Sequence, residues 1–458
     1  MAYGAKLAQL ERGDRTSLKI GILSDTHLGA SSIDPELRMD TFETFEEGLK
    51  TLVGAGADVI LHAGDFYDRT DPQPWVHDKA TTIIRSTITG RRPNLEVLEG
   101  KVNFEAEDVS IAVPVFLIHG THDRPIGRPA PAPPFQHLVS AGYVNYLDVD
   151  PDNKFASKHI VIKKGGTKVL LTGAGHRPEG YINESISKCG IPHKTGCVNI
   201  SCIHNAVEGT VPASEYVDLS SFQNIDYVVM GHAHKAHLDG KGALQAEKRG
   251  DLKTKILVPG ATNATSVSQQ EEGRKYVHLI EIGPENRIAL KSFELKKARQ
   301  VFHRRITCEN LTAGQTRNKI LDVLNNLPLD VLEKKPRVKV YLTGKLASKT
   351  RRTELDLEGI ASGYKDKVYN WSDMIIPSDL YTEEELEHLE KLRGAVESGA
   401  VFSAPLERFC QKLRQLGFSG RYFSPEELYQ IFSEVKSPRV AKGRVMEKLN
   451  GVLGVEPD

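Results

Sequence analysis

The chain has 458 residues, of which 39% are hydrophobic and 26% charged, and its 60 Lys and Arg balance its 60 Asp and Glu. This length allows two to four domains with a substantial core. The absence of net charge excludes a globally basic protein, so any surface that binds nucleic acid must be local. Five cysteines and the lack of an apolar run of bilayer length argue against a disulfide framework and a membrane span, and predict a cytoplasmic protein.

The first predicted element is a strand that begins at Leu18 and ends just before Asp25 and His27. Its apolar residues, Ile20, Ile22 and Leu23, indicate a strand buried on both faces, as in an α/β sheet. Side chains at the carboxyl end of such a strand point into a crevice. Because side chains alternate along an extended chain, we expect Asp25 and His27 to lie on the same side and to form one corner of a metal site.

Helical spacing of apolar residues follows at 40–53 and again at 76–88, so that strand and helix alternate. Residues 94–110 are acidic and weakly patterned, which indicates a surface excursion. The proline-rich residues 125–134 exclude a helix or a central strand. They are either a stiff loop at the rim of the site or a linker.

Four further apolar runs, at 57–63, 113–118, 197–203 and 225–230, each end in Asp or His, and in three of them a glycine stands beside these residues. The polar residues in question are Asp65, Thr121, His122, Asp123, His204, His232 and His234. Any one of them could be a helix cap or a polar turn. Five strands that all end this way predict a single shared site.

From residue 159 to residue 278 strands predominate, which predicts a second sheet packed on the first. Residues 276–282 alternate as a half-exposed strand should. The predicted fold class is therefore α/β, with a two-sheet sandwich flanked by helices over residues 1–295.

A small, locally basic α/β unit is predicted at 296–378, with strands at 301–308, 337–342 and 367–376 and helices at 315–327 and 353–362. Its Lys and Arg residues are either a solvated face or contacts to phosphate. Past Pro377 the pattern is helical, with capping boxes at Thr382–Glu385 and Ser424–Glu427. Residues 379–458 are thus a predicted helical module that packs on itself or binds a partner helix.

The combined donor set is too large for one zinc ion and contains no thiolate. Mixed carboxylate and imidazole ligands suit Mn²⁺, Fe or Zn²⁺, and two ions bridged by one carboxylate would use the whole set. His122 is then free to face a phosphate as a proton donor, and Asp123 is expected to orient its ring. The predicted reaction class is metal-assisted hydrolysis of a phosphoester.

These motifs resemble those of the calcineurin-like metallophosphoesterases, which carry D-x-H, GD, GNH, a lone H and GHxH in the same order. The stretches Asp25–Gly29, Gly64–Asp68 and His119–Arg124 are similar to those of the Mre-eleven/SbcD nucleases of double-strand-break repair. The resemblance covers roughly residues 18–282.

The resemblance implies a Mn²⁺-dependent exo- and endonuclease, with Fe, Zn²⁺ or Mg²⁺ as other possible metals. It implies DNA as the substrate, a homodimer, and an SMC-like coiled-coil ATPase of the Rad-fifty/SbcC type bound by the C-terminal helices. It places Asp25, His27 and His234 on one ion and His204 and His232 on the other, with Asp65 as the bridge and His122 as the catalytic histidine. Such a nuclease would be associated with the nucleoid.

Two positions depart from the pattern of that family. Thr121 stands where the family has Asn, so a hydroxyl replaces an amide oxygen as a ligand of the second ion. Asp68 stands where many of these nucleases have His, and we expect Asp68, Arg69 and Arg124 to contact the substrate. Two alternatives stay open: a phosphodiesterase or phosphatase acting on small nucleotides or phosphoproteins, and a catalytically weakened scaffold.

Overall fold

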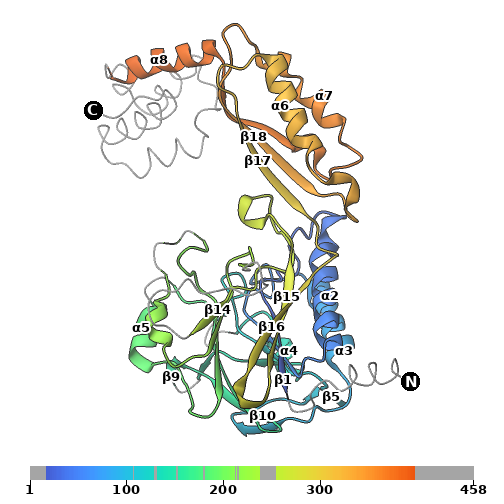
Figure 1. Ribbon diagram of the computed structural model, residues 1–458, viewed down its shortest axis with the longest axis vertical. Helices are drawn as coiled ribbons and strands as arrows, with labels where there is room; N and C mark the ends of the chain where they lie inside the picture. Colours follow the sequence, from blue (N-terminus) through green and yellow to red (C-terminus); the bar gives the residue numbers. More distant parts are fainter. Residues whose placement is uncertain are drawn as a thin grey trace. The chain divides into compact units, whose positions relative to one another are not determined.

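The computed structural model describes residues 17–397 except 107, 128–131, 151–152, 179–180, 212, 214–215 and 238–253. Two compact units divide the chain (Figure 1). The first comprises Met1–Phe302 and Leu332–Pro336, and the second His303–Val331 and Arg337–Asp458. The predicted helical module lies outside the described residues from 398 onward, including the expected capping box at Ser424.

The first unit contains a mixed six-stranded sheet in the order β16-β15-β1-β2-β6-β7. Strands β1, β2, β6 and β7 are parallel, whereas β15 and β16 add as an antiparallel pair on the far side of β1. The bounds are Leu18–Leu23 for β1, Val59–His62 for β2, Val115–Leu117 for β6, Val144–Tyr146 for β7, Tyr276–Ile282 for β15 and Ile288–Glu294 for β16.

A second six-stranded sheet has the order β14-β13-β12-β11-β10-β3. Its strands β11 to β14 are parallel, and β10 and β3 are antiparallel to their neighbours. The bounds are Glu96–Glu99 for β3, His159–Lys164 for β10, Thr167–Ala174 for β11, Val198–Ile203 for β12, Tyr227–Met230 for β13 and Lys255–Leu257 for β14. The two sheets confirm the predicted fold class.

One hydrophobic cluster fills the space between the sheets, with Ile20 and Ile22 of β1 against Val198 and Ile200 of β12. The outer face of the first sheet is covered by α2 (Asp40–Gly54) and α3 (Pro74–Ile88), which lie side by side (Figure 1). The outer face of the second sheet contributes to a third cluster that includes Phe222 and α5 (Tyr181–Cys189). Burial on both faces explains the continuous apolar runs.

Shorter elements complete the first unit. They are α4 (Gln136–Ser140), the small strands β4 (Glu105–Ala106), β5 (Val109–Ser110), β8 (Val149–Asp150) and β9 (Asn153–Ser157), and the 3-10 helices η1 (Leu37–Met39), η2 (Leu219–Phe222), η3 (Gln269–Glu271) and η4 (Pro284–Asn286). None of the helices in the described part of the chain combines the length and apolar composition that a bilayer span requires.

Two expectations about strands in this unit are wrong. Residues 94–110 do not form a mere surface excursion, because β3 is the edge strand of the second sheet and pairs with β10. An edge strand needs few apolar residues, so the acidic sequence of this segment gave no sign of β3. Strand β15 is almost wholly buried rather than half exposed, since β1 and β16 flank it and the two cores cover its faces.

The second unit contains a three-stranded sheet in the order β17-β18-β19 with helices α6, α7 and α8. The bounds are Val301–Thr307 for β17, Ala313–Asn325 for α6, Arg337–Lys345 for β18, Leu357–Ser362 for α7, Ile375–Tyr381 for β19 and Glu383–Glu397 for α8. The 3-10 helices are η5 (Leu329–Val331), η6 (Arg352–Leu355) and η7 (Trp371–Asp373).

The order of elements in this unit follows the prediction, but two positions differ. The helix expected at 353–362 breaks at Asp356, whose φ of 48° separates η6 from α7. The last strand is β19 instead of 367–376, so it crosses the expected domain boundary after residue 378. The capping box at Thr382 is confirmed, since Glu385 Oε2 accepts from Thr382 N at 2.8 Å and Thr382 Oγ1 accepts from Glu385 N at 3.3 Å.

Several basic residues of the segment 296–378 are paired with acids. Arg299 is buried against Asp40 at 2.6 Å, and Lys334 Nζ lies 2.8 Å from both Asp40 and Glu43. In the second unit, Lys339 pairs with Asp373 and Arg352 with Glu385. These four cations form ion pairs within their own unit. A DNA-binding surface would therefore have to consist of the remaining basic residues.

Candidate metal centre

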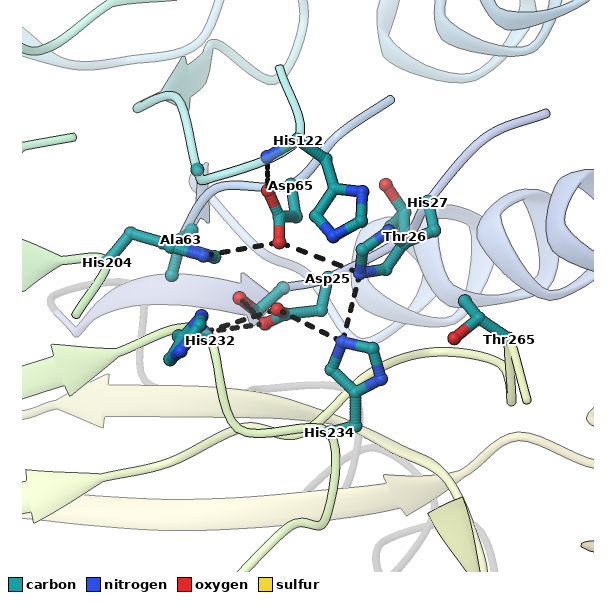
Figure 2. Close-up of polar contacts among 12 residues, drawn as sticks. Asp25, Thr26, His27, Ala63, Asp65, His122, His204, His232, His234 and Thr265 are labelled. Carbon is teal, nitrogen blue, oxygen red and sulfur yellow. Dashed lines mark hydrogen bonds and ion pairs between the residues drawn. The ribbon is translucent and has the colours of Figure 1, made fainter. Parts of the chain in front are cut away.

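Five strands deliver their following loops to one place, where the predicted side chains meet (Figure 2). β1, β2 and β6 come from the first sheet, and β12 and β13 from the second. Because the carboxyl ends of parallel strands in one sheet share an edge, each sheet presents its loops to the same crevice. Backbone bonds tie the loops together: Gly64 O accepts from Asp25 N at 3.0 Å and Asp65 O accepts from His27 N at 3.0 Å.

The donor atoms form three overlapping groups, within each of which all donors lie within 4.8 Å of one another. The groups are Asp25, His27 and His234; His27, Asp65 and His122; and Asp65, His204 and His232. Asp65 Oδ2 lies 3.3 Å from His204 Nε2 and 3.6 Å from His27 Nε2 (Figure 2). Asp65 therefore belongs to the group of His204 and His232 and also lies beside His27 of the first group, where a bridging ligand would stand.

Four of these residues have backbone conformations that L-residues rarely adopt. The φ angles are 47° for Asp25, 43° for His27, 51° for Asp65 and 87° for His232. The chain around Asp25 and His27 is thus not extended. The two side chains do meet, but the reason that we gave, the alternation of side chains along an extended strand, is wrong. Backbone strain of this kind is concentrated at functional sites, where the surrounding structure holds it in place.

Two glycines allow the loops to approach this closely. A Cβ atom on Gly231 would overlap the carbonyl oxygen of Ala63 and would lie 2.6 Å from His204 Nδ1. A Cβ atom on Gly120 would overlap the carboxylate of Asp65. Glycine at these positions is therefore required by space, since any side chain would push a donor out of its group.

A second layer of contacts orients the imidazoles. His234 Nδ1 donates to Glu271 Oε1 at 2.7 Å, and His204 Nδ1 donates to the carbonyl oxygen of Ala63 at 2.7 Å. In both His234 and His204 the proton is therefore on Nδ1, and the lone pair of Nε2 is available to bind a metal ion. Nε2 is also the atom that faces Asp25 in His234 and Asp65 in His204. Asp68 Oδ1 lies 3.2 Å from His27 Nδ1 and supports the third ring.

His122 is the exposed member of the cluster. Its backbone N–H donates to Asp65 Oδ1 at 2.8 Å and its ring Nδ1 donates to the carbonyl oxygen of Asp68 at 2.9 Å. The ring stands edge-on to His27 with 4.8 Å between centroids. Its Nε2 atom is thus left to solvent or substrate beside the donor groups.

Asp123 does not orient the ring of His122, contrary to the expectation. Its buried carboxylate accepts from the backbone N–H groups of Gly120 at 2.6 Å, Phe66 at 2.7 Å and Tyr67 at 3.2 Å. Burial and the charge of Asp65 raise the pKa of Asp123 to about 6. Asp123 thus clamps the loop after β6 to the loop after β2, and the orienting acceptor for His122 is the carbonyl of Asp68.

The structure places the other predicted residues as follows. Thr121 Oγ1 is buried without a hydrogen-bond partner in the described residues. Arg69 is exposed and only loosely paired with Asp71, at 3.9 Å, and Arg124 is exposed. The Asp68 carboxylate lies 3.2 Å from His27 Nδ1 while its side chain is 27% exposed, so its contact with the substrate stays a prediction.

The charges at the site favour a cation. Burial alone would lower the pKa of His27 and His204, yet the neighbouring carboxylates outweigh it and raise both values to about 9. Burial opposes ionisation of Asp65 as well, but His204 and the other imidazoles hold its pKa well below the usual value. A pocket that attracts protons this strongly has a negative potential, which also stabilises metal ions.

Residues outside the sequence motifs support the site and were missed from the sequence. Glu271 is buried, pairs with Lys275 at 2.9 Å, and lies 37 positions from the His234 that it orients. The ring of His176 lies 6.3 Å from the rings of both His204 and His232. No local pattern marks either residue, because only the fold brings them to the site.

The residues present fit divalent metal ions. The donors are carboxylate oxygens and imidazole nitrogens, which suit Mn²⁺, Fe or Zn²⁺ better than Ca²⁺. His204 Nε2 and Thr121 Oγ1 are buried without hydrogen-bond partners among the described residues. Because buried polar atoms normally have partners, these two atoms are available as ligands.

Comparisons with known proteins agree with this geometry. The sequence profile of the calcineurin-like phosphoesterases matches residues 18–236. The chain is 27% identical over 318 residues to double-strand break repair protein MRE11 of Macaca fascicularis, covering 65% of this chain and 44% of the relative. For MRE11 of Mus musculus the values are 27% over 310 residues, 63% and 42%, and for protein mus-23 of Neurospora crassa 25% over 335 residues, 69% and 44%.

The chain spans less than half the length of these curated relatives. The matched segment begins at β1 and ends just after His234, so it contains all five loops of the metal centre. Residues 18–236 of the chain are thus similar to the calcineurin-like phosphoesterases over the whole stretch that forms the metal centre.

Proposed function

We propose that this protein is a metal-dependent DNA nuclease of double-strand-break repair, which hydrolyses phosphodiesters with a water activated by two metal ions. The observation that carries the proposal is the position of Asp65, whose Oδ2 lies 3.3 Å from His204 Nε2 in one donor group and 3.6 Å from His27 Nε2 in another. A phosphoesterase domain and relatives that are named as double-strand break repair proteins support DNA as the substrate.

In this proposal, Asp25, His27 and His234 would hold one ion, His204 and His232 would hold the other, and Asp65 would be a ligand of both. Thr121 supplies a neutral oxygen at the second ion. When bound, such a pair lowers the pKa of a coordinated water and neutralises negative charge on the phosphate. Mn²⁺ is the ion we expect.

The residues of the chain then divide the remaining work. His122 donates its Nδ1–H to the Asp68 carbonyl, so its exposed Nε2 faces the substrate. In the imidazolium form, with both ring nitrogens protonated, the Nε2–H gives its proton to the leaving oxygen and the ring returns to the neutral form. Glu271, Asp68 and the Ala63 carbonyl keep the three ligand rings in the required tautomer. Arg69 and Arg124 are exposed and suited to neighbouring phosphates of the strand.

The proposed assembly is a homodimer that works with an SMC-like coiled-coil ATPase in the cytoplasm, on the nucleoid. The relatives are named as double-strand break repair proteins, which supports DNA as one partner of this assembly. The helices expected to bind the ATPase lie mostly outside the described residues. A test is co-purification of the full chain with the candidate ATPase, compared with a chain that ends at residue 397.

A substrate comparison tests the proposed chemistry. Purified protein with Mn²⁺ is given a DNA duplex with one blunt and one hairpin end, a cyclic mononucleotide and a phosphopeptide at equal concentrations. Cleavage of DNA that exceeds turnover of the other two supports the nuclease. Preferential turnover of the cyclic nucleotide or the phosphopeptide would contradict it, and metal binding without any turnover would indicate a scaffold.

A further inference from the structure

A cavity of about 890 Å³ lies in the first unit, apart from the donor residues of the metal centre. Its walls come from three segments that the fold brings together: residues 97–104 at the end of β3, residues 139–147 around β7, and residues 158–160 at the start of β10. Arg92 closes one side. None of the residues that line it belongs to the three donor groups.

The charge of this cavity is positive. Arg92, Lys101 and Lys158 line it, together with His159, and no acidic side chain is among its described lining residues. Arg92 lies 4.4 Å from the centroid of the Phe104 ring, and Lys158 Nζ lies 5.6 Å from that of Tyr146.

None of the carboxylates in the described residues forms an ion pair with Arg92, Lys101 or Lys158. The nearby Glu99 is directed to His159, at 3.8 Å, and to Lys194. Cations held over aromatic rings and not neutralised by acids attract an anionic ligand.

Apolar side chains make up much of the remaining wall, so a small inorganic anion would leave most of the cavity unfilled. They include Val97, Phe104, Val139, Val144, Leu147 and Ile160. Cavities of about 300–1,000 Å³ with apolar walls and a few polar groups are typical sites for small organic ligands. The ligand indicated is therefore an anion with a flat apolar body.

We propose that this cavity, defined by Arg92, Lys101, Phe104, Tyr146 and Lys158, binds a mononucleotide. The phosphate is held by the cations and the base lies against the apolar wall. The proposal does not depend on the nuclease activity, because the site shares no residue with the metal centre.

The cavity is nevertheless joined to the metal centre by a chain of contacts. The Tyr146 hydroxyl donates to Asp148 Oδ2 at 3.0 Å and lies 2.7 Å from His119 Nδ1. His119 directly precedes the loop that carries Gly120 and His122. A ligand that contacts Tyr146 therefore contacts the residue whose hydroxyl holds His119, at the start of this loop.

Calorimetric titration of the full chain with AMP tests the proposal, in buffer with EDTA so that the metal centre cannot bind phosphate through an ion. We expect one AMP per chain. Arg92→Ala and Lys158→Ala should each weaken binding about tenfold, because each removes one charge-assisted contact to the phosphate. The matched controls are Arg85→Ala and Lys79→Ala, which remove an exposed and a half-buried cation of α3 from outside the cavity.

Three outcomes would overturn the proposal. The first is that AMP binds the Arg92 and Lys158 variants as tightly as the two control variants. The second is that inorganic phosphate binds as tightly as AMP, which would show that the apolar wall contributes nothing. The third is that Asp65→Asn abolishes AMP binding, which would place the nucleotide in the metal centre. Thermal unfolding of each variant checks that its fold is intact.

Discussion

His234 Nδ1 and Glu271 Oε1 are joined by a hydrogen bond of 2.7 Å that fixes which nitrogen of the ring faces Asp25. The same carboxylate accepts from Thr265 N at 3.0 Å and from Lys275 Nζ at 2.9 Å. Glu271 is thus held rigidly, and these partners keep its pKa well below the usual value although burial opposes ionisation. A carboxylate behind a ligand histidine raises the basicity of the ring and orients it.

Replacing Glu271 by Gln should therefore weaken Mn²⁺ binding by roughly 10–100-fold without touching the metal directly. Equilibrium dialysis against Mn²⁺ measures the effect. Because Gln leaves the buried Lys275 ammonium without a carboxylate partner, Glu271→Gln/Lys275→Met serves as the second variant, with unfolding midpoints measured for both. Unchanged Mn²⁺ affinity in both variants would mean that Glu271 does not act through His234.

The position of His122 leads to a second prediction. Its ring is exposed, and the Asp68 carbonyl fixes its tautomer, so His122→Gln should lower the rate of DNA cleavage by roughly 10²–10⁴-fold. The Mn²⁺ content should stay the same, because the proposed ligand set does not include His122. His193→Gln removes another exposed imidazole and is the control. Equal loss of metal and of activity in His122→Gln would reassign His122 as a ligand.

Space around Gly231 gives a third prediction. Gly231→Ala should displace His204 from Asp65 and reduce both Mn²⁺ binding and cleavage, because the new Cβ would overlap the Ala63 carbonyl. Gly166→Ala is a matched control, since no heavy atom lies within 4 Å of a Cβ added there. We expect wild-type activity and unfolding midpoint for Gly166→Ala. An active Gly231→Ala with normal metal content would show that the loops are not packed as described.

His278 gives a prediction about pH. Its buried ring donates from Nε2 to the Pro259 carbonyl at 3.1 Å and contacts Ser292 Oγ at 2.9 Å through Nδ1. Burial lowers its pKa from 6.5 to about 4. Between pH 6.5 and pH 4 the unfolded chain thus binds a proton at His278 that the folded chain does not. The contribution of His278 to the free energy of unfolding is therefore complete above pH 6.5 and decreases as the pH falls toward 4.

Between pH 7 and pH 4, the titration of His278 should lower the free energy of unfolding by roughly 3 kcal/mol. Urea unfolding of the wild type and of His278→Gln over this range measures it, because the other titrating groups cancel in the difference. The stability of the wild type should fall more steeply than that of the variant. Parallel curves would mean that His278 is not buried in the neutral form.

The strands and the donor residues could be predicted because each donor directly follows an apolar run in the sequence. Asp25, Asp65, His204 and His232 are all of this kind. Contacts between distant segments could not be predicted: Glu271 and His176 reach the site only through the fold, and Asp123 turned out to bind backbone N–H groups instead of His122. The sequence pattern also did not predict the break at Asp356, whose left-handed backbone conformation separates two helices, or the edge strand β3.

The central claim is that Asp65 lies between two metal ions. Anomalous diffraction from crystals grown with Mn²⁺ tests it most directly. We predict two manganese peaks about 3.5–4 Å apart, both in contact with the Asp65 carboxylate, one beside His27 and His234 and the other beside His204 and His232. A single peak at saturating Mn²⁺, or two peaks of which only one contacts Asp65, would contradict the two-metal mechanism.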